Sequence, residues 1–144
     1  MLNDEVLKLK NQLCFPLYAC SREVIKKYNQ FLDPLGLTYT QYIAMMVLWE
    51  QKSVNVKALG EQLYLDSGTL SPLLKKMEAQ GLVIRNRDAK DERNVIVTIT
   101  PQGEKLKEDA ISIPAKIGSC IHLNKEDASN LYRLLYQVLN AKFN

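Results

Sequence analysis

The feature that most constrains the fold is a change of hydrophobic period between residues 67 and 100. In its first half, apolar residues recur at steps of three and four, which predicts one face of an α-helix that ends at Gly81. These residues are Leu70, Leu73, Leu74 and Met77. The second half predicts two strands, over 82–87 and 94–100, because residues 95–99 alternate at period two. The segment 88–93 between them is hydrophilic apart from Ala89, so we expect a projecting β-hairpin.

Two further helical segments precede this region. Thr38 and Gln41 have the spacing of a capping box, and a mostly apolar helix follows them. Residues 56–63 form a short helical pattern, and residues 64–66 make a turn before the helix at 67–80. The start of that helix is ambiguous because of Pro72: either Ser71 caps a helix that begins at the proline, or Asp66 caps a longer one.

The two ends of the chain also show helical period. Residues 2–32 carry apolar side chains at steps of three, four or seven, with Pro16 either kinking the helix or starting a new one. The last helix starts at Asn124 and has an unbroken apolar stripe. We therefore predict one domain over residues 1–144, mainly α with a small β-hairpin wing, an α+β winged helix-turn-helix. Residues 37–100 form the DNA-binding lobe, and helices within 1–36 and 101–144 form a dimerisation lobe.

The composition is that of an ordinary globular domain, with 144 residues and a net charge of +3. No segment has the length of a membrane span, and the N-terminus has no signal-peptide pattern, so we expect a cytoplasmic protein with no membrane partner. The single histidine and three widely spaced cysteines lack the spacing of a zinc site. We accordingly expect no metal and no cofactor.

The predicted helix-turn-helix has a face suited to DNA. Short hydroxyl side chains fit close to base edges, and lysines neutralise phosphates. On the helix these residues are Ser67, Thr69, Ser71, Lys75 and Lys76, and on or beside the hairpin they are Arg85, Arg87, Lys90 and Arg93. Acidic residues largely balance the charge of the hairpin, so the order of the elements, rather than the charge, predicts binding to double-stranded DNA.

The segment from Ala58 to Glu78 resembles the helix-turn-helix of MarR-family regulators, 87–93 resembles their wing, and Thr100-Pro101-Gln102-Gly103 resembles the start of their next helix. The resemblance implies a homodimer on a pseudo-palindromic operator, most often a repressor. By position, the hydroxyl residues 67, 69 and 71 would meet the major groove, and Arg93 would meet the minor groove.

Within that family the N-terminal half resembles the organic-hydroperoxide-resistance (OhrR-like) regulators. The matching segments are 13–23, Tyr28 and 37–42. The resemblance implies that Cys14 is the peroxide-reactive thiol and that Tyr28 and Tyr39 of the partner subunit hydrogen-bond it. It also places Cys120 in the region where some of these proteins have a resolving cysteine, and either that thiol or a small external one would resolve the sulfenic acid.

Chemistry supports the same thiol independently. If a helix begins at Pro16, Cys14 lies just before its positive end, which favours the reactive thiolate. Tyr18 is one helical turn away and can donate to the sulfur, whereas Tyr28 is about 21 Å along a helix axis and would need a partner subunit or a chain reversal. Composition alone favours a core role for a cysteine among apolar neighbours, and we assign that role to Cys20.

Two other functions fit parts of the sequence. A regulator of the same fold could be released by a small aromatic ligand in a cleft lined by Tyr18, Tyr42 and Trp49. A thiol peroxidase would also use Cys14, but no histidine lies near it in the sequence. We therefore predict a regulator that is not an enzyme and that releases its operator when an organic hydroperoxide oxidises Cys14.

Overall fold

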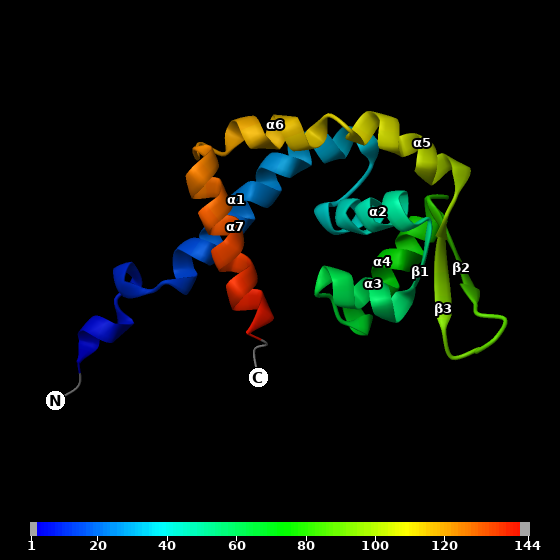
Figure 1. Cartoon of the computed structure of the whole chain (residues 1–144), viewed down its shortest axis with the longest axis horizontal. Helices are drawn as coiled ribbons and strands as arrows, with labels where there is room; N and C mark the ends of the chain where they lie inside the picture. The colour runs from blue at the N-terminus through cyan, green and yellow to red at the C-terminus, as the bar shows by residue number, and fades with distance from the viewer. Residues whose placement is uncertain (1–2, 142–144) are drawn as a thin grey trace. The chain divides into compact units, whose positions relative to one another are not determined.

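A computed structural model describes residues 3–141 and has the predicted mainly helical fold with a small sheet (Figure 1). The chain divides into two compact units, the first ending at Ile113 and the second starting at Pro114. The first unit contains η1 (Asp4–Leu7), η2 (Leu9–Asn11), α1 (Cys14–Leu32), η3 (Asp33–Leu35), α2 (Tyr39–Gln51), β1 (Ser53–Asn55), α3 (Val56–Leu63), α4 (Ser67–Ala79), β2 (Val83–Arg87), β3 (Val95–Ile99) and α5 (Pro101–Ala110). α6 (Ile113–Cys120) and α7 (Lys125–Asn140) follow.

The N-terminal segment becomes an α-helix only at Cys14, after two short 3-10 turns. Pro16 lies in the first turn of α1, where the helix has no use for the missing amide hydrogen. The helix therefore starts two residues before the proline that was expected to start or kink it. At the other end, Gly36 has a φ of 71°, a left-handed conformation that suits glycine and lets the chain turn into α2.

The helix-turn-helix is held by caps at the start of each helix. The side-chain oxygen of Asn55 accepts from the amide of Lys57 at the start of α3. The carboxylate of Asp66 accepts from the amide of Thr69 at 2.8 Å, so α4 begins at Ser67 and contains Pro72. Of the two predicted starts, the longer helix capped by Asp66 is confirmed. Between the helices, Tyr64 has a backbone φ of 56°, a left-handed conformation that few residues other than glycine adopt.

The sheet has three antiparallel strands in the order β1–β3–β2. Strands β2 and β3 are the predicted hairpin, with Arg85 opposite Val97. Strand β1 was not predicted, because three residues are too few to show a period; its Val54 pairs with Val97 on the other side of β3. In Figure 1 the hairpin extends beyond the helices, and its loop forms a wing.

The core of the first unit forms where α2, α4 and the sheet converge. Buried side chains include Met45, Leu48, Leu59, Leu70, Leu74, Met77 and Val97. Trp49 joins α2 to α5, because its indole N–H donates to the carbonyl of Gly103 at 2.9 Å. This packing holds α4 by its apolar face and leaves the opposite face for contact with other molecules.

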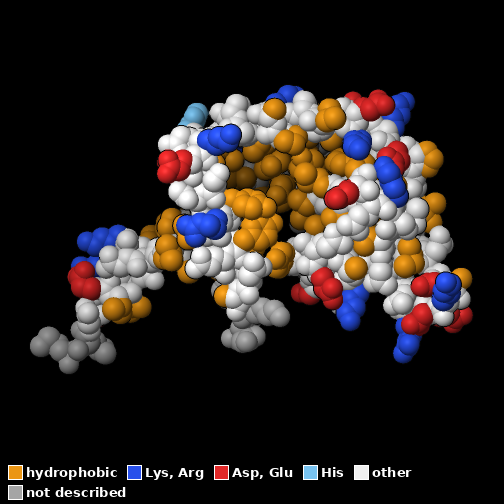
Figure 2. Space-filling view, viewed as in Figure 1, with side chains coloured by type: hydrophobic (Ala, Val, Ile, Leu, Met, Phe, Trp, Pro, Cys, Tyr) orange, Lys and Arg blue, Asp and Glu red, His pale blue; other side chains and the backbone are white. Residues whose placement is uncertain are grey.

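The second unit presents the apolar stripe predicted for the last helix. Five of its residues on α7 are between 37% and 47% exposed in the single chain. They are Leu131, Leu134, Leu135, Val138 and Leu139, and Figure 2 shows hydrophobic side chains on the surface of this helix. Within residues 3–141, none of the helices has both the length and the apolar character needed to cross a bilayer. The assignment of the terminal helices to a dimerisation lobe stays a prediction.

Candidate functional site

The exposed face of α4 carries the hydroxyl and lysine side chains that were predicted to read DNA. Leu70, Leu74 and Met77 are buried on the other face. The residues on the exposed side, each of them open to solvent, are Ser67, Thr69, Ser71, Lys75 and Lys76. The structure therefore brings the five predicted residues to one helix that is fixed by its core contacts.

The wing presents Arg93 outward, with 91% of its side chain exposed. Its guanidinium pairs with the Asp91 carboxylate at 3.1 Å, and this hydrogen bonding holds the pKa of Asp91 below its usual value. Arg87 donates to the carbonyl of Glu92 at 2.8 Å and so closes the loop at its base, while Lys90 is exposed. Figure 2 shows basic and acidic side chains next to one another around the tip of the wing.

Arg85 lies differently from the other predicted DNA-binding residues. Its guanidinium pairs with Glu78 at 3.2 Å, and its backbone amide donates to the same carboxylate at 2.8 Å. These contacts lower the pKa of Glu78, the backbone hydrogen bond most strongly. The side chain of Arg85 is only 29% exposed, and its buried Nε has no hydrogen-bond partner. Arg85 thus joins α4 to the wing.

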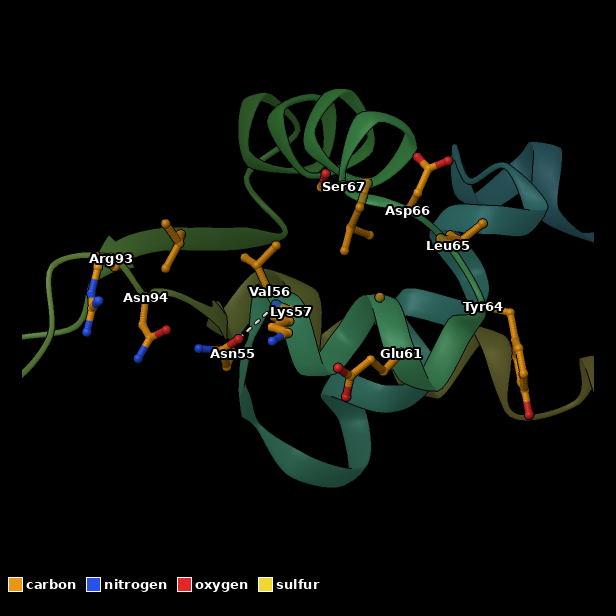
Figure 3. Close-up of a pocket in the computed structure, with 13 residues that line it drawn as sticks. Asn55, Val56, Lys57, Glu61, Tyr64, Leu65, Asp66, Ser67, Arg93 and Asn94 are labelled. Atoms are coloured by element: carbon orange, nitrogen blue, oxygen red, sulfur yellow. Dashed lines mark hydrogen bonds between the residues drawn. The ribbon is translucent and has the colours of Figure 1, made fainter. Parts of the chain in front are cut away.

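A groove of about 690 Å³ separates α3 and the start of α4 from the base of the wing. Figure 3 shows Ser67 and Asp66 on its α4 side, with Arg93 and Tyr64 near opposite ends. Sequence reasoning missed five of its polar lining residues, Asn55, Lys57, Glu61, Tyr64 and Asn94. Asn94 is next to Arg93 in the sequence, whereas Asn55 comes close to the wing only through the β1–β3 pairing.

Cys14 is the first residue of α1 and is exposed, so its sulfur lies at the positive end of a helix of 19 residues. The sequence predicted Cys14 just before a helix start, and in the structure it is the first residue of that helix. Tyr18, one turn further on, is also exposed, and its hydroxyl accepts from Arg22 at 3.2 Å. Cys14 therefore has both the access and the helix position that a reactive thiol needs.

Tyr28 and Tyr39 lie side by side although they come from different helices. Their ring centroids are 4.9 Å apart, and Tyr42 lies 5.8 Å from Tyr28. Burial raises the pKa of all three phenols above the ordinary value of 10.0. Since Tyr28 and Cys14 share α1, about 21 Å of helix separates them within one chain.

The aromatic residues proposed to line a ligand cleft do not come together in this way. Tyr42 and Trp49 are 2% and 8% exposed and pack against each other in the core, with ring centroids 6.3 Å apart. Tyr18 is exposed on α1 instead. Their arrangement favours a structural role for Tyr42 and Trp49.

A comparison with known families identifies the class of protein. Residues 26–110, more than half of the chain, match the model of the transcriptional regulators SarA/Rot. The chain belongs to the SarA/Rot family of transcriptional regulators. Its fold is that of the MarR-type winged-helix regulators, which confirms the resemblance seen in the sequence.

Individual relatives match this family member over nearly its whole length. The organic hydroperoxide resistance transcriptional regulator of Bacillus subtilis is 51% identical over 135 residues, which are 94% of this chain and 92% of that protein. The regulator SarZ of Staphylococcus aureus is 41% identical over 94% of this chain and 91% of its own length. Among solved structures, reduced AbfR bound to DNA is 34% identical, with a TM-score of 0.80 over 97% of this chain and 98% of that one. AbfR comes from Staphylococcus epidermidis.

The remaining two cysteines of this SarA/Rot-family chain differ in their surroundings. Cys20 was predicted to be a core residue but is exposed on α1 in the single chain. Cys120 is the last residue of α6 and half-buried, and its thiol donates to the carbonyl of Lys116 at 3.3 Å. Among the described residues, no group of three or more histidine, cysteine or acidic side chains is placed to hold a metal ion.

Proposed function

We propose that this chain is a homodimeric repressor that binds operator DNA when reduced and releases it when an organic hydroperoxide oxidises Cys14. One observation carries the proposal most directly. Cys14 is an exposed thiol at the first residue of α1, in a chain that is 51% identical to a regulator named for organic hydroperoxide resistance.

The DNA-binding part rests on α4 and the wing. A single winged helix reads one half-site, and two copies related by a twofold axis would read a pseudo-palindromic operator. The related protein AbfR has been solved on DNA in its reduced form. In the proposed complex the hydroxyl face of α4 enters the major groove and Arg93 reaches the minor groove, which favours arginine where it is narrow. Binding to an operator also implies a cytoplasmic location.

The sensing step is a two-electron oxidation of sulfur. The Cys14 thiolate attacks an oxygen of the hydroperoxide, an S–O bond forms as the O–O bond breaks, and the alcohol leaves after taking up a proton. The product is a sulfenic acid. In the proposed dimer, Tyr28 and Tyr39 of the partner subunit donate hydrogen bonds to the thiolate, and oxidation removes this arrangement.

The sulfenic acid then condenses with a second thiol, forming an S–S bond and releasing water. Two thiols fit this step, Cys120 of the partner subunit and a small external thiol. AbfR has been solved in a disulfide form and, separately, overoxidised and bound to DNA. A Cys120→Ser variant separates the two routes on a non-reducing gel, because it loses the covalent dimer only if Cys120 is the resolving thiol.

Release of the operator requires a large shift in free energy. To change occupancy from about 99:1 to 1:99, oxidation must favour the state that cannot bind DNA by about 5.5 kcal/mol. We further propose that the protein is a sensor and not a thiol peroxidase. A sensor consumes about one equivalent of hydroperoxide per Cys14, whereas a peroxidase with excess reductant consumes many.

The decisive experiment measures operator binding by fluorescence anisotropy before and after one equivalent of cumene hydroperoxide. We expect the wild type to be released and the Cys14→Ser variant to bind DNA normally but stay bound after treatment. The Cys20→Ser variant is the matched control, since Cys20 lies on the same helix and is also exposed. If Cys14→Ser is still released by hydroperoxide, the proposed sensor is wrong.

A further inference from the structure

A buried glutamine connects the segment next to the sensor tyrosines with the recognition helix. Gln41 on α2 is only 1% exposed. Its side-chain oxygen accepts from the backbone amide of Thr38 at 3.1 Å, and its side-chain nitrogen donates to the side-chain oxygen of Gln80 at 3.0 Å. Both ends of this buried amide are therefore engaged, which fixes its orientation.

Gln80 continues the connection from the other side. It is the residue that caps the C-terminal end of α4, and its backbone amide donates to the carbonyl of Lys76. Its side-chain nitrogen donates to the carbonyl of Gly36 at 3.0 Å. The two glutamines thus close a ring of hydrogen bonds that ties residues 36–38 to the end of the recognition helix. We name this set, Gly36, Thr38, Gln41 and Gln80, the glutamine relay.

The relay adjoins the tyrosine cluster directly. Thr38, which it holds by the backbone amide, is the cap residue immediately before Tyr39. Tyr39 in turn packs against Tyr28 at 4.9 Å between ring centroids. Leu37, between the two relay backbone groups, is buried at 3% exposure, so this segment is held on both its polar and its apolar side. A displacement of Tyr39 would therefore act on Thr38 and, through the amides, on Gln80.

We propose that Gln41 and Gln80 are positioning residues that couple the state of the tyrosine cluster to the orientation of α4. This inference rests on the proposed function, in which oxidation of Cys14 releases Tyr28 and Tyr39 of the partner subunit. Gln41 is the buried member of this network, and a buried amide that loses one of its two partners is costly, so its links to Thr38 and Gln80 are kept or lost together. Movement of residues 36–39 then moves the end of α4 with them, or breaks the relay and frees the helix.

The test compares operator affinity in the reduced and the oxidised protein. In Gln80→Ala both side-chain links of Gln80 are lost. In Gln80→Glu the carboxylate still accepts from Gln41 but has no hydrogen to donate to Gly36. The matched control is Gln62→Ala, because the exposed Gln51–Gln62 pair also joins two helices through side-chain amides, at 3.0 Å, but it links α3 to the end of α2 opposite Tyr39.

We expect the ratio of oxidised to reduced Kd to fall by about tenfold in Gln80→Ala, within the usual range of coupling between sites, and by less in Gln80→Glu. The rate at which Cys14 forms sulfenic acid stays as in the wild type, and Gln62→Ala keeps the full ratio. A loss of affinity that is equal in both states would show a merely structural role and overturn the proposal, as would an equal fall in Gln62→Ala. If the wild type itself is not released by hydroperoxide, the proposed function fails, and the coupling proposal fails with it.

Discussion

At the scale of single residues, Gly103 shows how closely the wing base packs against α5. A Cβ atom at this position would lie 2.4 Å from the carbonyl oxygen of Leu82 and 2.8 Å from a side-chain carbon of Ile99. Neither the backbone carbonyl of the buried Leu82 nor the side chain of Ile99 on β3 can move away cheaply. The third residue of α5 therefore has to lack a side chain, and its carbonyl is also the acceptor for Trp49.

We expect Gly103→Ala to lower the free energy of unfolding by about 3 kcal/mol, the upper part of the usual range for an overpacked core. Gly118→Ala is the control, because a Cβ there meets no atom within 4 Å. Alanine at position 118 of α6 should raise the free energy of unfolding by about 0.5–1 kcal/mol. Urea denaturation at a fixed protomer concentration measures both, and a Gly103→Ala variant as stable as the wild type would contradict the packing argument.

The three clustered tyrosines predict a dependence on alkaline pH. Burial raises the pKa of Tyr28, Tyr39 and Tyr42 above the ordinary value of 10.0. A raised pKa means that the fold favours the neutral phenol, so this contribution to stability is complete below pH 10.0 and is lost as the pH rises through the folded-state values. In a phenolate absorbance titration of the native protein, Tyr28→Phe should therefore remove a group that titrates above pH 10.0.

At the scale of elements, the recognition helix and the wing act as one body because Glu78 on α4 holds Arg85 on β2 twice, through its backbone and its side chain. This gives the cations of the DNA-binding surface two different roles. Lys76 is exposed on α4 and available to a phosphate, whereas Arg85 is already neutralised by Glu78.

These roles predict different responses to salt. Each phosphate contact contributes about 0.9 to the slope of log affinity against log salt concentration. In a dimer, Lys76→Ala should therefore lower the slope by about 1.8. Arg85→Gln should weaken binding by disturbing the wing and leave the slope nearly unchanged. Anisotropy titrations over a series of salt concentrations measure both, and a reduced slope in Arg85→Gln would instead mean that Arg85 contacts DNA.

At the scale of the whole molecule, the apolar stripe of α7 leaves a row of aliphatic side chains partly exposed in the single chain, and contiguous exposed apolar surface marks interaction sites. Five aliphatic side chains occupy one face of the helix, while Arg133 and Gln137 fall between them in the sequence. An arrangement of this kind is typical of a helix that packs against a second copy, as the proposed binding to a pseudo-palindromic operator requires.

We expect Leu135→Asp to shift the protein to monomers in sedimentation-velocity experiments, because a carboxylate on an apolar interface is costly to bury. Operator affinity should fall with dimerisation, since one winged helix then binds one half-site. Arg133→Ala, a change at a polar position of the same helix, should leave both properties as they are. A Leu135→Asp protein that remains a dimer would place the interface elsewhere.

The sequence alone determined the features that depend on neighbours a few residues away. The capping box at Thr38 and Gln41, the helical stripe of α4 and the alternation of β3 all follow from interactions within one turn or one strand, and so they appear as patterns in the chain. The MarR-family resemblance likewise pointed to the wing, and the OhrR-like resemblance predicted Cys14 as the reactive thiol. These resemblances could be found from the sequence because the residues concerned form continuous motifs.

Only the tertiary structure decided what depends on distant segments meeting. Three pairings are of this kind: β1 with β3, Arg85 with Glu78, and Gln41 with Gln80. No pattern in the sequence indicates that these residues interact. In the sequence, each partner is only a polar residue or a short segment with no distinctive pattern. The buried core of α2, α4 and the sheet brings the partners together. Burial then makes the pairing obligatory, because a polar group removed from water must find its hydrogen bonds within the protein.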